Sequence, residues 1–402
     1  MPTLDDIVIL EHAGQAEWLQ IVQLVGELES WLLSDNDFNQ WSNGLGPENF
    51  NLIVAVDKAT QKQVVGSVAT ALYKSIDGSP PLVTVGMFFI RPEYRGLGLG
   101  LILFEKVLAD PRFKGVNRGL NGVPAMTKKY ASKHGFDKYA DWKLGVAGMR
   151  NPPGEINSGD IPGDFPGDMR GISPGTNFWV FLVLNVTMFQ KVRCEIPRGK
   201  SKNGDIPGDI PRGKSPGISP SHPWGVVEAD TKDIATSALE SESTAANVKI
   251  VNVADVPFDK IVAYDVKQLD GIRRDGYLKL ALTDPSAWSK VALDSDGNIV
   301  GLVRIRPGFG NQLAVGPWYA ESTNIAAAIL KATIESIPNL TNYNNLFIFP
   351  ADTNKEAYTL FDKLAQGKSI DHGTMFGQFT DNVVKTDPTE VFSMTEYAMS
   401  FV

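Results

Sequence analysis

The sequence predicts two α/β domains separated by a segment of different character. Its 402 residues exceed the size at which one hydrophobic core usually stops growing, which favours two globular units. Apolar stretches of helical or strand periodicity alternate with short turns in the first and last parts of the chain, and each part has the length of an ordinary domain. We therefore expect domains over residues 1–150 and 248–402, with residues 151–247 between them.

The intervening segment is crowded with proline and glycine. The hexapeptide GDIPGD occurs at residues 159–164 and again at 204–209, and neither helices nor sheet interiors tolerate such a composition. Residues 151–224 are expected to be a disordered insert, and residues 228–247 a polar linker. An apolar run at residues 178–189 is too short for a bilayer-spanning helix, which needs about 20 residues. We interpret it as a docking strand or a stretch under no folding selection.

Composition excludes several classes of function. The net charge of -8 gives no field that would collect polyanions, so nucleic acid is not an expected partner. The acidic first residues resemble no secretory signal, and we expect a cytoplasmic protein without membrane contact. A single cysteine, Cys194, excludes an internal disulfide framework. The four histidines lack partners at ligand spacing, so no metal is expected.

The first domain is predicted to alternate strands and helices. The expected strands are residues 7–10, 52–56, 64–72, 82–90 and 116–120, and the expected helices are residues 15–33, a helix through Leu101, Phe104 and Leu108, and residues 124–134. Pro124 at the start of the last helix and Gly135 just past its end are typical helix punctuation.

The chemistry is expected in the loop after the strand at residues 82–90. Gly96, Gly98 and Gly100 allow backbone N–H groups to face outward, and the helix that follows offers free donors and a positive dipole end. Such an arrangement binds a pyrophosphate. Leu101 stands where a dinucleotide fingerprint needs its third glycine, and no Gly-Lys-Ser/Thr follows. These details argue against a Rossmann site and a nucleotide P-loop.

Residues 88–100, FFIRPEYRGLGLG, resemble the cofactor motif of the GNAT superfamily of N-acyltransferases. The motif Arg/Gln-x-x-Gly-x-Gly/Ala is matched by Arg95, Gly98 and Gly100, and the order of elements over residues 1–150 is also similar. The resemblance implies a mostly antiparallel central sheet flanked by helices, with acetyl-CoA or another acyl-CoA bound where the long strand diverges from the next. The implied cofactor-binding residues are Phe88, Phe89, Ile90, Arg95, Gly96, Leu97, Gly98, Leu99 and Gly100.

Catalysis in this family resembles direct attack of a neutral amine on the thioester, often with a tyrosine that protonates the departing thiolate. Tyr130 is the candidate acid, although it lies five residues before Gly135 where the common form has four. The alternative is a ring in the core with its hydroxyl in water. No Asp or Glu occurs in residues 82–90, so no base is assigned, and an ordered water is an alternative.

The last domain repeats this order of elements. A hairpin over residues 291–301 turns at Asp296 and Gly297, and the sequence GPWYA at residues 316–320 stands where the first domain has its glycine loop. This resembles the divergent second domain of tandem GNAT proteins. Pro317 has no N–H, and bulky side chains fill the space that glycines keep open, which predicts a structural or substrate-shaping domain. Trp318 and Tyr319 are expected in the core, or else in an acceptor pocket.

The sequence therefore predicts an intracellular tandem GNAT N-acyltransferase that acts on a small-molecule or protein amine. The alternative is a non-catalytic acyl-CoA-binding or scaffold protein with a degenerate GNAT fold.

Overall fold

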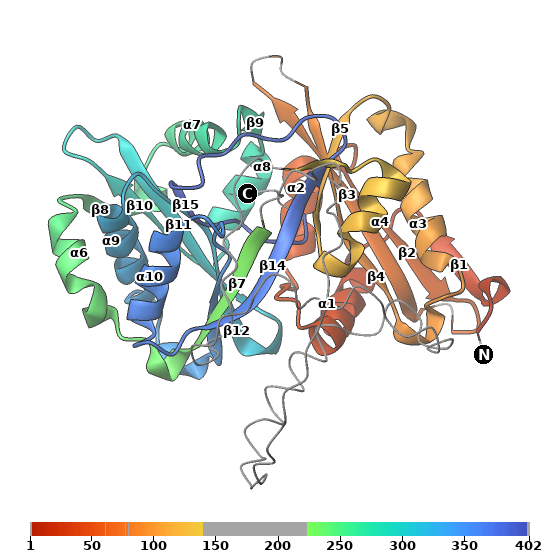
Figure 1. Cartoon of the computed structure of the whole chain (residues 1–402), viewed down its shortest axis with the longest axis horizontal. Coiled ribbons are helices and arrows are strands. Elements are labelled where there is room, and N and C mark those ends of the chain that lie inside the picture. Colours follow the sequence, from red (N-terminus) through yellow and green to blue (C-terminus); the bar gives the residue numbers. More distant parts are fainter. Residues whose placement is uncertain (1, 61, 77, 79, 140–222, 400–402) are drawn as a thin grey trace, which may run out of the picture.

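The computed structural model of the chain describes residues 2–60, 62–76, 78, 80–139 and 223–399. Of the insert expected over residues 151–224, residues 151–222, including the apolar run at residues 178–189, lie outside these described residues, and residues 223 and 224 begin a strand instead. The described residues form a 15-stranded mixed sheet that carries helices on both faces (Figure 1).

The first half follows the predicted order. Its strands are β1 (Ile7–Leu10), β2 (Phe50–Asp57), β3 (Val64–Ser75), β4 (Leu82–Ile90), β5 (Asn117–Gly122) and β6 (Lys138–Tyr139), and its helices are α1 (Gln15–Glu29), α2 (Asp37–Leu45), α3 (Leu99–Leu108) and α4 (Pro124–His134). α1 ends earlier than expected because Ser30 adopts a left-handed φ of 56° at its C-cap. α2 was not expected, because two of its three buried residues, Asp37 and Gln40, are polar and break the apolar period.

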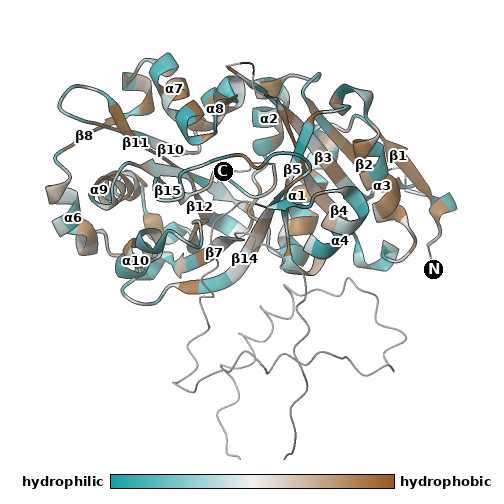
Figure 2. Cartoon of the chain, turned by 45° about the horizontal axis from the view of Figure 1, so that its top comes forward, coloured by the Kyte–Doolittle hydropathy of each residue, from teal (hydrophilic) through white to brown (hydrophobic). Residues whose placement is uncertain are grey.

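Different helices cover the two faces of this half. α1 and α2 pack on one face through Trp18 and Trp41, while α3 and α4 pack on the other through Phe104 and Tyr130. The hydrophobic colour lies on strands β2 and β3, and hydrophilic colour marks the outer turns of the helices (Figure 2). The sheet is therefore buried on both faces.

The second half contains the same series. Its elements are β8 (Lys249–Asn252), α7 (Phe258–Gln268), β9 (Ile272–Arg273), α8 (Asp275–Leu282), β10 (Trp288–Leu293), β11 (Ile299–Gly308), β12 (Gln312–Ala320), α9 (Thr323–Ile334), β13 (Asn345–Ile348) and α10 (Lys355–Leu364). The predicted hairpin is present, and Gly297 has the positive φ of 80° that its turn requires.

Each half contributes a strand to the other. β7 (Pro223–Asp230) follows the first half in the chain but pairs antiparallel with β13, and β14 (Ile370–Phe379), from the end of the chain, pairs antiparallel with β5. β7 and β14 pair with each other, so the sheet runs β1-β2-β3-β4-β5-β14-β7-β13-β12-β11-β10-β8. Read inward from its two ends, this order is the same in both halves, with β4–β5 and β12–β13 as parallel pairs.

The segment expected to be a polar linker is thus partly a strand within the sheet. Buried Val227 and Ala229 alternate with Glu228 and Asp230, a period-2 pattern that the polar composition of the segment concealed. Residues 231–247 then form short 3-10 turns and α6 (Glu240–Ala245), which packs near α9.

β14 completes the core of the first half. The ring of Phe379 covers Gly119 of β5 so closely that a Cβ on this glycine would lie 2.8 Å from it. Gln378 is fully buried and its Nε2 donates to the carbonyl of Phe136 at 2.8 Å and to that of Thr127 at 3.1 Å. A strand from the end of the chain therefore holds α4 and β5 in place.

The halves also meet through α2 and α8. A Cβ on Gly276 would lie 2.0 Å from the carbonyl oxygen of Gly44, so the two helix backbones approach closely. Beside them β9 pairs with the end of β3, with Arg273 opposite Lys74. Contacts from both faces of the sheet therefore fix the two halves relative to each other.

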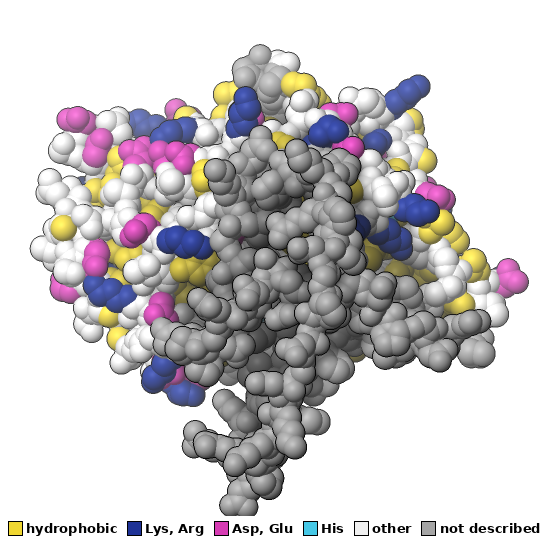
Figure 3. Space-filling view, viewed as in Figure 1, with side chains coloured by type: hydrophobic (Ala, Val, Ile, Leu, Met, Phe, Trp, Pro, Cys, Tyr) yellow, Lys and Arg dark blue, Asp and Glu magenta, His cyan; other side chains and the backbone are white. Residues whose placement is uncertain are grey.

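Charges of both signs are interspersed on the face shown in Figure 3, outside the atoms drawn in grey. Among the residues that the structure describes, no helix combines the length and apolar character needed to cross a membrane.

The role of β14 predicts a large effect of Phe379→Ala. Removing this buried ring, which is 4% exposed, should lower the free energy of unfolding by about 3–5 kcal/mol, because it leaves a cavity over Gly119 of β5. Urea unfolding measures the change. Ile370→Ala is the matched control, because Ile370 lies in the same strand but is 41% exposed, and its effect should stay within about 0.5 kcal/mol. Equal effects of the two changes would contradict the prediction.

Candidate functional site

β4 and β5 pair only over their first residues. The parallel register joins Leu82 to Asn117 and Thr84 to Gly119, and among the described residues it ends there. β4 continues to Ile90, so its backbone groups on this side face the opening between the two strands. This is the divergence at which the sequence predicts the cofactor.

A bulge at Met87 directs the second part of β4. Met87 has a φ of 53°, and the register with β3 shifts between Ser67 and Ala69. The buried hydroxyl of Ser67 donates to the carbonyl of Met87 at 2.7 Å and so holds the bulge. Beyond it, Phe89 packs in the core under α1 and α2, whereas Phe88 packs toward α3. The bulge therefore sets the direction of the backbone at the predicted cofactor contacts.

The glycine loop leaves open space at the start of α3. Gly96 and Gly98 have φ values of 84° and 89°, and a Cβ on either would meet nothing within 4 Å. Gly98 is the N-cap of α3, whose first N–H groups have no partner within the helix. Gly100 serves packing instead, since its Cβ would lie 3.1 Å from Cζ of Phe88.

The loop fits the pyrophosphate of an acyl-CoA. Glycine conformations give the backbone access to an anion, and the start of a 10-residue helix supplies a positive dipole end. Leu99 is buried, so it reaches a ligand only through its backbone, whereas Leu97 is partly buried against the same core. Among the described residues, no group of three or more His, Cys, Asp or Glu is placed to hold a metal.

Arg95 is engaged within the protein. Its Nε donates to the carbonyl of Ile90 at 2.8 Å, and its Nη2 forms a 2.7 Å ion pair with Glu29 of α1. The guanidinium thus fastens the glycine loop to the end of β4 and to α1. The cofactor contacts predicted for Arg95 and Ile90 stay predictions. In this structure the guanidinium of Arg95 binds the carbonyl of Ile90.

Tyr130 lies beside the divergent end of β5. Its ring stacks on Phe104 at 5.5 Å between centroids, and a Cβ on Gly122 would lie 3.3 Å from its Cδ2. Burial raises the pKa of the Tyr130 hydroxyl well above its usual value. The phenol therefore stays protonated at neutral pH and is a weaker acid than a thiol, whose pKa is about 8.5. Tyr130 is suited to donate a hydrogen bond to sulfur rather than to release its proton.

The second half has a strand where a loop was expected. β12 continues through residues 316–320 with a register shift against β11 between Val315 and Trp318, and Trp318 and Tyr319 are fully buried, which confirms core packing. β15 (Val391–Ser393) pairs with β12 at these two residues, and Phe392 packs on Trp318 with ring centroids 5.0 Å apart. The place where β12 could diverge from its neighbour is therefore filled by the chain itself, and the expected loop is corrected to a strand.

Residues 394–399, here called the C-terminal strap, connect the two halves at this level. Cβ atoms added to Gly316 of β12 and Gly86 of β4 would lie 2.3 Å from the carbonyl oxygen of Met394 and 1.5 Å from that of Ala398. Nδ2 of Asn121 in β5 donates to the carbonyl of Tyr397 at 3.1 Å. The strap thus touches β4 and β5 where they diverge.

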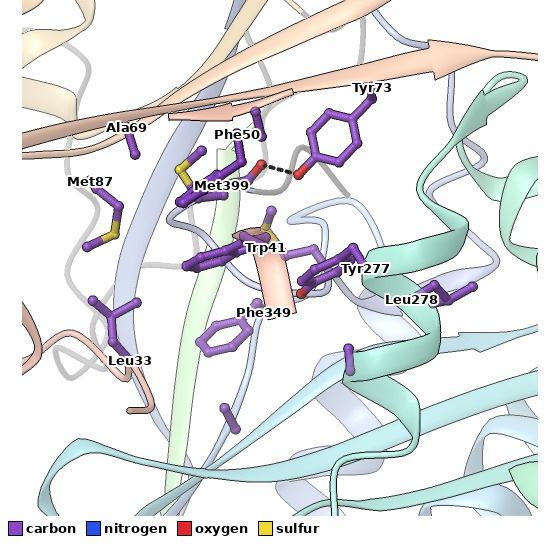
Figure 4. Packing of buried hydrophobic residues seen from close by; sticks show 14 of the residues in the cluster. Leu33, Trp41, Phe50, Ala69, Tyr73, Met87, Tyr277, Leu278, Phe349 and Met399 are labelled. Atoms are coloured by element: carbon purple, nitrogen blue, oxygen red, sulfur yellow. Dashed lines mark hydrogen bonds between the residues drawn. The ribbon is translucent and has the colours of Figure 1, made fainter. Parts of the chain in front are cut away.

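The strap also packs into the hydrophobic core that lies between the sheet and helices α1 and α2. The hydroxyl of Tyr73 donates to the carbonyl of Met399 at 3.1 Å, beside Trp41 and Met87 (Figure 4). Sequence reasoning missed this contact. Gly86 and Gly316 inside strands were the available signal, because such glycines mark a close backbone approach.

Glu396 is the buried carboxylate of the strap. It is 4% exposed and accepts hydrogen bonds from the N–H groups of Met399, at 2.9 Å, and Ala398. Burial, followed by the nearby charge of Asp37, raises the pKa of Glu396 to about 7, although Arg306 opposes the rise. A carboxyl group near the divergence of β4 and β5 therefore titrates close to neutrality.

The comparisons with known proteins agree with this geometry. The family model for the acetyltransferase (GNAT) family matches residues 17–136. The structure of a "putative acetyltransferase" from Pyrococcus horikoshii is similar over 100% of this chain and 98% of that chain, at 12% identity and a TM-score of 0.54. Residues 17–136 therefore form a GNAT-family domain.

Two further similar proteins match part of the chain or share only its fold. An uncharacterized protein of Caenorhabditis elegans is 31% identical over 117 residues, which are 29% of this chain and 34% of that protein, so the chain spans about a third of this curated relative. A tandem GNAT protein from the clavulanic acid biosynthesis pathway is similar over 93% of this chain and 97% of that chain, at 13% identity and a TM-score of 0.48.

The open loop predicts that Gly98→Asp abolishes acyl-CoA binding. The change places a carboxylate where a pyrophosphate must approach the helix donors, and affinity measured by calorimetry should fall at least about 100-fold, or about 2.7 kcal/mol. Gly115→Asp is the matched control, because Gly115 has a φ of 73° and also meets nothing within 4 Å, but lies beyond the other end of α3. An unchanged affinity of Gly98→Asp would refute the loop assignment.

Proposed function

We propose that this GNAT protein is an acyl-CoA-dependent N-acyltransferase that transfers an acyl group, acetyl in the first instance, to an amine. The observation that carries the proposal is the open glycine loop at α3 beside a β4 that continues past its pairing with β5. The family match over residues 17–136 supports the same reaction class.

In this proposal the first half binds the acyl-CoA. The backbone N–H groups of Gly98, Leu99 and Gly100 at the start of α3 receive the pyrophosphate. The open edge of β4 at Phe88 and Phe89 receives the pantetheine and the acyl carbonyl. The thioester then lies near the bulge, where the acceptor nitrogen attacks the carbonyl carbon and the C–S bond breaks. Holding both reactants in this geometry is the main source of rate.

The second half shapes the acceptor side. Its own β12 is covered by β15, so it offers no second cofactor loop in the described residues. Its strap lies against Gly86, on the face of the sheet that carries α1 and α2. The acceptor, a small-molecule or protein amine, approaches from this face, opposite α3 and α4.

Release of free thiol from acetyl-CoA across a panel of amines tests the proposal. We expect thiol release that depends on one class of amine and is lost in Gly98→Asp. Acyl-CoA binding without turnover on any amine would favour the alternative, a non-catalytic acyl-CoA-binding or scaffold protein. The two outcomes are separable because calorimetry reports binding independently of turnover.

Tyr130→Phe tests the hydroxyl of Tyr130 while keeping its ring. A hydrogen bond to the departing sulfur predicts a fall in kcat of about tenfold, below the 10²- to 10⁴-fold typical of a full general acid, because burial raises the pKa of this phenol. Steady-state kinetics on a productive amine measure it. Tyr264→Phe, at a buried tyrosine of α7 in the second half, should change kcat by less than about twofold. A kcat of Tyr130→Phe within twofold of wild type would remove the hydroxyl from the mechanism.

A further inference from the structure

The strands that flank the proposed thioester position carry no base. β4 reads LVTVGMFFI and β5 reads NRGLNG, without Asp, Glu or His. An alkyl ammonium resembles that of lysine, with a pKa of about 10.4, and it must lose a proton before its nitrogen can attack. A proton acceptor must therefore come from an element that packs against these strands.

The strap brings one carboxylate to this place. Glu396 caps the N–H groups of Ala398 and Met399, and the carbonyl of Ala398 presses on Gly86, one residue before the bulge of β4. The strap also receives the hydrogen bond from Asn121 of β5. Glu396 is thus fixed to the segment that touches both divergent strands, on the acceptor side of the sheet.

The charged and titratable groups around Glu396 come from four elements. Asp37 of α2 and Arg306 of β11 form a buried ion pair at 3.5 Å, and Tyr73 of β3 and Tyr277 of α8 also interact electrostatically with the Glu396 carboxylate. Because Arg306 already has Asp37 as its partner, Glu396 has an anion beside it and no full counter-charge of its own. This environment favours a carboxylate that readily takes up a proton.

We propose, resting on the transfer reaction above, that Glu396 is the general base that takes a proton from the acceptor ammonium, directly or through one water. The ammonium gives one proton to the carboxylate, and the nitrogen lone pair then forms the C–N bond to the acyl carbon. The C–S bond breaks, and a second nitrogen proton passes to the thiolate through water or the Tyr130 hydroxyl. The resulting carboxylic acid returns its proton to solvent, so the products are the amide, free CoA and one proton.

Glu396 as the base predicts a pH dependence of kcat that the residues of β4 and β5 would not produce. A base whose pKa of about 7 lies near the working pH is partly ionised there and accepts protons most effectively. Deprotonation is required for activity, so kcat rises with pH up to about 7 and then levels off. This increase of kcat with pH reflects the ionisation of Glu396 and does not come from the loop that binds acyl-CoA.

The experiment compares the full-length wild type with Glu396→Gln and Glu396→Asp on one productive amine. We expect Glu396→Gln to lower kcat at neutral pH by about 10²- to 10⁴-fold, to lose the acidic limb of the pH profile and to keep its affinity for acetyl-CoA. Glu396→Asp keeps a carboxylate and should retain the acidic limb. Asp371→Asn is the control, because desolvation also raises the pKa of this β14 carboxyl although its residue is exposed, and the change should leave the profile unchanged.

Three results would overturn the proposal in different ways. A kcat of Glu396→Gln within twofold of wild type, with the acidic limb intact, removes Glu396 as the base and leaves the transfer reaction standing. A wild type that binds acetyl-CoA but acylates no amine removes the transfer reaction and the base role together. A loss of acetyl-CoA affinity in Glu396→Gln equal to its loss of kcat also contradicts a base, because it indicates a strap that only supports the binding site.

Discussion

The pairing of β14 between β5 and β7 is the interaction on which the rest of the structure depends. Without β14, β5 would be an exposed edge beside the divergence of β4, and unpaired edges invite pairing with other chains. β14 also carries the chain across to the first half, and β15 then returns it to β12. Only this route brings residues 394–399 back over β4 at Gly86. The strand exchange thus positions both the sheet edge and the acceptor wall.

The exchange gives two halves with one strand order and different uses. In the first half, glycines of positive φ keep the start of α3 open, and β4 is free to diverge from its neighbour. In the second half, the end of β12 holds Trp318 and Tyr319, both fully buried, and β15 pairs with the strand there. Separating β15 from β12 would expose the large aromatic side chains of Trp318 and Tyr319 to water. The burial that stabilises the second half is therefore the same feature that closes it to a cofactor.

Local elements were predictable from the sequence, and non-local ones were not. β4 and α4 have the predicted bounds because each has its own apolar pattern and its own terminator, the proline after Arg91 for the strand and Gly135 for the helix. The glycine loop was found for the same local reason. β14 contains two glycines and a histidine and is half exposed at its start, so only its distant partners make it a strand. α2 escaped detection because its buried Asp37 and Gln40 are satisfied by Arg306 and Arg304 of the second half.

The buried polar pairs between α2 and β11 hold the two halves together and also surround Glu396 of the proposed site. Removing charged groups from water costs free energy that a single ion pair scarcely offsets, so Asp37 and Arg306 contribute alignment of the halves more than stability. The same burial raises the pKa of Glu396, whose folded form binds a proton that the unfolded chain releases above about pH 4.5. Stability from this group therefore declines as pH rises from about 4.5 to 7. A buried carboxylate that costs stability when ionised lies where the two halves meet, which is the pattern expected where a group serves chemistry rather than folding.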